Sequence, residues 1–286
     1  MQQHQSILGY KGGRYLWLAL FTCAAAIAAY AWHEPPTVYL KPYGGTWLGY
    51  TLGGIGAAMI VWLMLLGVRK RRYRNAVGGL QGWTSAHVYL GTSLIVIVSL
   101  HCAFEFGWNI HTLAYALMVA VVVSGFFGVY AYLHYPELMT KNAGNETLET
   151  MLTKIADLDY KCRRIALDLP DQINAVVVSA SRSAERNVAD TGRRRALVRV
   201  LNPASCPTFA ACNALKKLGR TLTGEEARLN EQLLTEMTRK RGLTERVRND
   251  LRYRALLQLW LYFHVPLAFA LLAALIAHVV AVFYFW

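Results

Sequence analysis

Two histidine pairs with the same spacing are the residues of this chain best suited to bind a metal. His87 and His101 have thirteen residues between them, and so do His264 and His278. Each pair lies in an apolar stretch, where an ionisable side chain is costly and usually functional. In a helix, fourteen residues rise about 21 Å and return to within about 40° of the starting face. Each stretch is therefore expected to present two imidazoles at two depths.

The composition places these pairs in a membrane. Of the 286 residues, 55% are hydrophobic, and the mean hydropathy is +0.27, values that exclude an ordinary soluble domain. A hydrocarbon core is crossed by about 20 helical residues. Five segments meet this requirement: residues 15–33, 47–68, 83–104, 111–133 and 257–284. The histidine pairs fall in the third and fifth segments, and backbone pairing requires all five to be helices.

The charge distribution predicts how the spans are oriented. The connection between the second and third spans holds five closely spaced cations: Arg69, Lys70, Arg71, Arg72 and Arg74. The connection between the third and fourth spans has no Lys or Arg. By the positive-inside rule, residues 1–14 are cytoplasmic and the C-terminus is external. A topology and lipid-headgroup signal explains this basic cluster without nucleic-acid binding.

A polar segment, residues 140–255, separates the four spans of residues 15–139 from the last, in residues 256–286. From Thr140 to Arg254 it holds 22 Lys or Arg and 14 Asp or Glu, which suits a basic cytoplasmic insert. Helical periodicity predicts one helix over 145–167 and another that begins near Thr223 and continues into the last span. No order is assigned to 169–222. Without a nucleotide-binding motif, the insert is interpreted as a docking element.

The cysteines give only weak metal signals. Cys206 and Cys212 form C-x5-C, whereas a structural zinc or iron–sulfur site usually needs four ligands. No C-x-x-C-H occurs, which argues against covalently attached haem.

The predicted topology makes the third and fifth spans parallel and thereby pairs the histidines. His87 and His264 should meet near the cytoplasmic side, and His101 and His278 near the external side, about 20 Å apart. Bis-imidazole ligation suits a low-spin haem iron that carries electrons. Zinc would need further ligands. We therefore expect two non-covalent haem b groups; a haem-free pathway for protons or a transported metal is the alternative.

Other residues are expected to serve these sites. Gly53, Gly91 and Gly125 would let helix backbones approach a porphyrin, and Arg72 would pair with its propionates. Ordinary helix packing predicts such glycines equally well. Further candidates of the same kinds are Gly49, Gly54, Gly56, Gly128, Arg74 and Arg254. Four aromatic residues are candidates to flank the haems: Trp83, Tyr89, Tyr262 and Phe263. The histidines outside the repeat are interpreted as interfacial or solvated: His4, His33, His111 and His134.

With these four histidines, the chain resembles the four-helix haem-binding half of the cytochrome b subunit of quinol:cytochrome c oxidoreductases. In that family, the second and fourth bundle helices each carry two histidines separated by thirteen residues. The resemblance covers four of the five spans and departs from the family in the extra first span and the long insert. Pro136-Glu137 is similar to a Pro-Glu pair at the family's quinol-oxidising site, although a solvated carboxylate at a helix end is the simpler interpretation.

The expected fold is therefore an all-α integral membrane protein with five transmembrane helices, four of which form a haem-binding bundle, and a helical cytoplasmic insert before the last span. The expected function is electron transfer across a bacterial inner membrane, as a subunit of an oxidoreductase complex rather than a stand-alone enzyme. Partners would be a cytoplasmic flavoprotein or iron–sulfur protein, an external cytochrome or iron–sulfur protein, membrane lipid and the quinone pool. A quinone-reactive anchor of a dehydrogenase is the nearest alternative.

Overall fold

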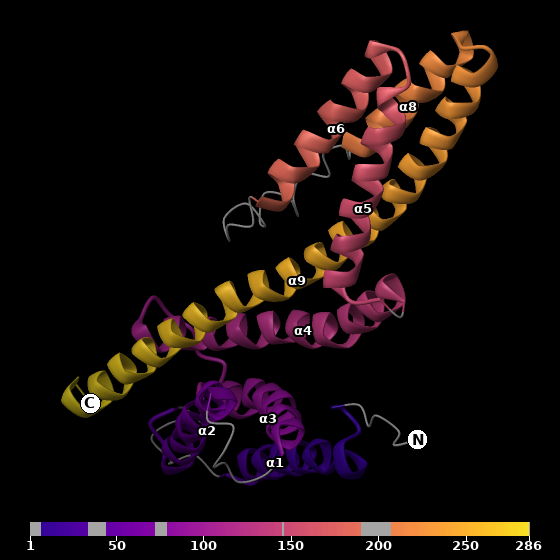
Figure 1. The fold of residues 1–286 in the computed structure, drawn as a ribbon. Coiled ribbons are helices and arrows are strands. Elements are labelled where there is room, and N and C mark those ends of the chain that lie inside the picture. Colours follow the sequence, from indigo (N-terminus) through magenta and orange to yellow (C-terminus); the bar gives the residue numbers. More distant parts are fainter. Residues whose placement is uncertain (1–6, 34–43, 72–78, 145, 190–206, 286) are drawn as a thin grey trace. The chain divides into compact units, whose positions relative to one another are not determined.

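The computed structural model describes the chain except for residues 1–6, 34–43, 72–78, 145, 190–206 and 286. The described part is helical throughout, without strands (Figure 1). The chain divides into two compact units. The first, called the membrane unit, comprises Met1–Val129 and Trp260–Trp286, and the second, called the insert unit, comprises Tyr130–Leu259.

Five helices are long and apolar enough to cross a membrane. They are α1 (Arg14–Trp32), α2 (Trp47–Arg71), α3 (Leu80–His101), α4 (Ile110–Ala143) and α9 (Gly224–Phe285). Large apolar side chains such as Trp17, Phe21 and Phe269 are exposed along them. Such exposure suits a lipid environment and not water. The predictions of an all-α fold with five spans are thus confirmed.

An apolar layer crosses the centre of the membrane unit. Its buried members come from four helices and are Ile60 and Leu63 of α2, Leu94 of α3, Met118 of α4 and Leu271 of α9. Leu94 is midway along the sequence between the two histidines of α3, and Leu271 is midway between those of α9. The layer therefore separates the two depths at which histidines occur.

The backbones of α1, α2 and α3 lie close together, whereas in the described residues of the membrane unit α4 and α9 meet the other helices chiefly through side chains. Helix α1 contributes Ala26 to a second cluster with Leu48, Leu52 and Ile97. Small residues such as Ala26 permit this close helix approach.

The insert unit has its own core. Its helices are the last part of α4, α5 (Leu148–Leu167), α6 (Asp171–Ala189), α8 (Pro207–Leu218), the 3-10 turn η2 (Gly219–Thr221) and the first part of α9. Buried side chains from these helices form one cluster, which includes Cys162, Val177, Leu215 and Met237. The helix predicted over 145–167 is confirmed as α5, and the helix predicted from Thr223 onward is confirmed as α9. Helices α6 and α8 lie where no order was assigned.

A charged residue is buried beside this core. Lys240 is 1% exposed and forms an ion pair with Asp159. Asp159 also accepts a hydrogen bond from Ser181 at 2.5 Å and pairs with Arg163 at 2.8 Å. A buried ammonium requires such a partner, because an unpaired charge away from water is costly.

Candidate metal centres

The structure brings together the two histidine pairs that the sequence predicts. The ring centroids of His87 and His264 are 6.4 Å apart, with the rings inclined at 65°. Those of His101 and His278 are 6.1 Å apart, inclined at 81°. In each pair, one ring comes from α3 and the other from α9.

Backbone carbonyls of α2 hold both histidines of α3. Nδ1 of His87 lies 3.1 Å from the Leu63 carbonyl oxygen, and Nδ1 of His101 lies 2.7 Å from that of Gly49. A carbonyl oxygen can only accept a hydrogen bond, so each ring must carry a proton on Nδ1. The proton on Nδ1 leaves the lone pair of Nε2 available to a metal.

Gly53 makes room for one of these rings. A Cβ atom at this position would lie 2.7 Å from Cε1 and 2.9 Å from Nδ1 of His101. Because these separations are below van der Waals contact, any side chain at position 53 would displace the imidazole. Gly53 therefore has a specific role at this site, although that contact says nothing of a porphyrin.

A serine and a tryptophan hold His264 of α9. Nδ1 of His264 lies 2.7 Å from the Ser124 hydroxyl, which donates its own hydrogen to the Val121 carbonyl at 2.8 Å. Because that hydroxyl has one hydrogen, it accepts from His264, which again places the imidazole proton on Nδ1. Trp260 packs 5.2 Å from the His264 ring and donates its indole N–H to the Ser124 carbonyl at 2.8 Å.

The remaining glycine candidates differ in their surroundings. A Cβ at Gly125 would be in ordinary contact with Cε1 of His264, at 3.8 Å, and one at Gly91 would contact Leu63 at 3.8 Å without reaching a histidine. A Cβ at Gly128 would overlap the Trp260 indole. Gly128 thus allows Trp260 to pack beside His264.

His278, the fourth ring, pairs with a histidine of α4. Nδ1 of His278 lies 2.5 Å from Nδ1 of His111, and the ring centroids are 4.4 Å apart. His111, interpreted from the sequence as interfacial or solvated, is partly buried in the structure against a histidine of the repeat. His111 precedes Ser124 by thirteen positions on α4, so the partners of the α9 histidines have nearly the same spacing as the histidines themselves.

All four rings therefore have Nδ1 engaged, and no hydrogen bond within the described residues engages any Nε2. Metal-binding histidines usually have this arrangement, with the second ring nitrogen held by a carbonyl, hydroxyl or other polar group. No group of three or more His, Cys, Asp or Glu side chains in the described chain is placed to hold a metal ion. The centres consequently offer two imidazoles each.

The aromatic residues expected to flank the site have other contacts or are exposed. Trp83 stacks on Trp62 at 5.0 Å, and the Tyr89 hydroxyl donates to the Leu8 carbonyl. Tyr262 and Phe263 are 54% and 68% exposed. These contacts involve no paired imidazole, so the flanking role of the four aromatic residues stays a prediction. Trp260, by contrast, packs directly against the His264 ring.

The candidate polar residues have other partners or fall outside the description. Arg72 and Arg74 lie outside the described residues. Arg254 donates to Asp250 at 2.7 Å, and the exposed Glu137 pairs with Lys141 at 2.6 Å. Glu137 thus has the surroundings of a solvated carboxylate at a helix end.

The cysteine pattern does not form a described site. Cys206 lies outside the described residues, whereas Cys212 is buried in the apolar core of the insert unit together with Cys162. There the two thiols pack as small hydrophobic side chains.

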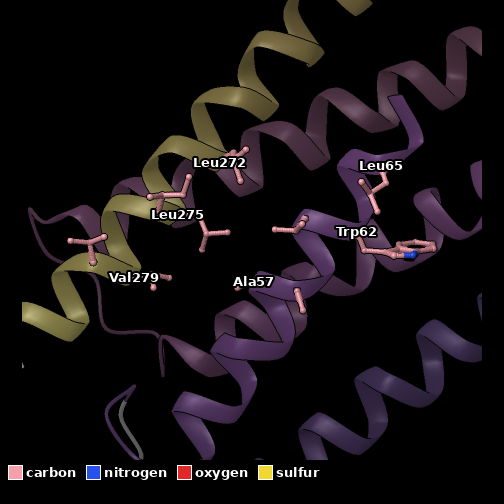
Figure 2. A pocket seen from close by; sticks show the side chains of 10 residues that line it. Ala57, Trp62, Leu65, Leu272, Leu275 and Val279 are labelled. Carbon is pink, nitrogen blue, oxygen red and sulfur yellow. The ribbon is translucent and has the colours of Figure 1, made fainter. Parts of the chain in front are cut away.

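An apolar groove of about 560 Å³ lies between α2 and α9 of the membrane unit (Figure 2). Its lining includes Ala57, Trp62, Leu65, Leu272 and Val279. The Trp62 indole nitrogen is the only side-chain polar atom among the ten lining residues. The groove suits a hydrocarbon chain better than a quinone headgroup, which needs hydrogen-bond partners.

No family model, curated protein or solved structure matches the chain. The fold and its paired imidazoles define a multi-pass, all-helical membrane protein with two candidate metal centres.

Proposed function

We propose that this chain is a dihaem b-type cytochrome subunit that transfers electrons across a membrane within a larger redox complex. The observation that carries the proposal is the state of the four imidazoles. They form two pairs at two depths, each ring is anchored through Nδ1, and no hydrogen bond within the described residues engages any Nε2.

The separation within each pair is right for one shared ion. A bond from a metal to an imidazole nitrogen is about 2.0–2.1 Å long, and the ring centroid lies roughly 1 Å beyond that nitrogen. Two rings on opposite sides of one ion would then have centroids about 6 Å apart. The observed separations of 6.4 and 6.1 Å agree with this expectation.

The supply of ligands favours haem over a bare metal ion. Zinc would need further protein ligands, and none accompany the pairs in the described chain. In haem, the porphyrin supplies four nitrogens, and iron with two axial histidines provides a one-electron couple with no open coordination position.

The apolar layer between the two pairs favours electron transfer over a proton pathway. Its buried side chains, Ile60, Leu63, Leu94, Met118 and Leu271, have no group that can pass on a proton. Proton relays in membranes use chains of ionisable side chains. Electrons need no such chain, so the layer can exclude water without blocking function.

The orientation and partners of the subunit follow from charge and chemistry. We place the N-terminus in the cytoplasm of a bacterial cell and the C-terminus outside it, with His87 and His264 serving a cytoplasmic flavoprotein or iron–sulfur partner. His101 and His278 would serve an external cytochrome, an iron–sulfur protein or quinone. The groove beside Trp62 could seat the isoprenoid tail of a quinone, as the anchor alternative requires.

A dithionite-reduced minus oxidised visible spectrum tests the proposal, with haem quantified per purified chain. Two b-type haems per chain, with low-spin bands that carbon monoxide does not shift, are the expected result. A variant in which alanine replaces all four histidines (His87, His101, His264 and His278) should purify colourless. A colourless wild type from haem-replete cells would refute the cytochrome proposal. Reduction of the haems by a quinol would favour the quinone-reactive anchor.

A further inference from the structure

The four anchored imidazoles have unequal partners. His87 and His101 bind carbonyl oxygens, and His264 binds a hydroxyl oxygen. Only His278 binds a nitrogen base, Nδ1 of His111. An imidazole nitrogen is more basic than a carbonyl or hydroxyl oxygen and therefore accepts a hydrogen bond more strongly.

One proton must lie between Nδ1 of His111 and Nδ1 of His278. The proposed function determines which of the two rings donates it. If Nε2 of His278 gives its lone pair to iron, the neutral ring carries its proton on Nδ1 and must donate it. His111 then accepts through Nδ1 and keeps its own proton on Nε2. Hydrogen bonding of this kind orients a ligating histidine and increases its basicity.

The first turn of α4 holds His111 in a fixed position. The backbone N–H of Thr112 donates to the Asn109 side-chain oxygen at 3.0 Å, and the Thr112 hydroxyl accepts from the Gly107 N–H at 3.0 Å. These bonds cap the helix start one residue from His111. Its ring is thus presented to His278 from a rigid turn.

We propose that His111 is a positioning residue of the His101/His278 centre, which orients His278 and lowers the reduction potential of the iron bound there. The inference rests on the proposed dihaem function. A more basic ligand donates more electron density and favours the oxidised iron. The contact gives the ionisable side chain at position 111, in the first turn of an apolar helix, a polar partner.

The test compares full-length wild type with His111→Phe and His111→Gln, each purified with its haem. Redox titration should give a higher potential for one haem in His111→Phe and an unchanged potential for the other. The low-spin electron paramagnetic resonance signal of the same haem should shift. His111→Gln keeps a side-chain acceptor and should recover part of both changes. His134→Phe, at a histidine outside both pairs, should match the wild type.

The outcomes separate this inference from the proposed function. A wild type without haem overturns both. Two haems in His111→Phe with unchanged potentials and unchanged resonance signals overturn the role of His111 alone. If His111→Phe loses one haem, retention of that haem in His111→Gln supports positioning through the hydrogen bond. Its loss from both variants shows that His111 acts through packing and overturns the proposal.

Discussion

The insert unit buries an ionisable side chain and the membrane unit partly buries four, but the two units complete the bonding of these groups differently. In the insert unit, Lys240 pairs with Asp159, which Ser181 and Arg163 also bind. That network is closed, since its buried cation faces an anion. In the described part of the membrane unit, each paired histidine is hydrogen-bonded through Nδ1, and no hydrogen bond engages its Nε2.

The difference separates a stabilising group from a functional one. A satisfied buried ion pair keeps helices in register and has no capacity left for a ligand. An anchored imidazole with a free lone pair is a preorganised ligand, because its orientation is fixed before a metal arrives. The chemistry of this chain is therefore expected in the membrane unit, and the insert unit should affect it only through partners.

His87→Ala tests the histidine pairs and has the largest expected effect. The His87/His264 pair would lose one of its two ligands, so the variant should bind one haem per chain instead of two, while the haem at His101 and His278 stays. Haem content and redox titration measure this. His134→Ala is the matched control and should keep both haems. Loss of both haems from His87→Ala, or of the other haem, would contradict independent centres.

Lys240→Ala tests the closed network and has the next largest expected effect. Removing the ammonium leaves the Asp159 carboxylate without its buried partner, which should cost about 3–5 kcal/mol of the free energy of unfolding. Chemical denaturation of the purified protein, followed by circular dichroism, measures the loss. The haem spectrum should not change, because Lys240 belongs to the insert unit and the paired histidines belong to the membrane unit.

Two controls decide whether the loss comes from an unpaired charge. Lys141→Ala removes one partner of an exposed ion pair with Glu137 and should change stability by less than about 1 kcal/mol. Lys240→Met combined with Asp159→Asn removes both buried charges and should recover much of the lost stability. Equal losses in the double variant and in Lys240→Ala would instead point to a packing defect.

The helical fold and the pairing of the histidines could be predicted from the sequence because both depend on periodicity within single helices. Apolar length marks the spans, and the thirteen-residue spacing puts His87 and His101 on one side of α3. Helices α6 and α8 were not predicted from the sequence. The stretch 169–222 that contains them also holds Pro203, Pro207 and the arginine cluster at 193–195, which obscures any continuous helical pattern, and the two helices pack through the shared core of the insert unit.

The residues that anchor the histidines could not be predicted in the same way. Ser124 and His111 lie on a neighbouring helix, so their contacts depend on the rotation and axial position of α4 relative to α9, which no single-helix pattern supplies. Two features of the sequence nonetheless indicate these contact residues. Trp260 precedes His264 by four residues and shares its helix face, and the positions of His111 and Ser124 nearly repeat the histidine spacing.

Gly53→Ala tests whether the space beside the His101 ring is needed. The added methyl would displace the His101 ring, so we expect a loss of about 1–3 kcal/mol in stability and a shifted resonance signal from the His101/His278 haem. Gly54→Ala is the matched control, because nothing lies within 4 Å of its Cβ position. A helical Gly to Ala change without a clash should be neutral or stabilising. Equal behaviour of the two variants would contradict a specific role for Gly53.

The smallest expected effect is that of Ser124→Ala, which removes the hydroxyl acceptor of His264. The hydrogen bond from Trp260 goes to the backbone of Ser124 and survives, so the His264 ring keeps one of its two supports. Losing one neutral hydrogen bond should cost about 0.5–1.5 kcal/mol and raise the potential of the His87/His264 haem slightly. Ser124→Thr, which keeps the hydroxyl, should restore the potential.

Because a hydroxyl is a weaker acceptor than the His111 imidazole, the shift in potential caused by Ser124→Ala should be smaller than that caused by His111→Phe. An equal or larger shift would mean that the two centres are tuned by something other than their anchoring partners.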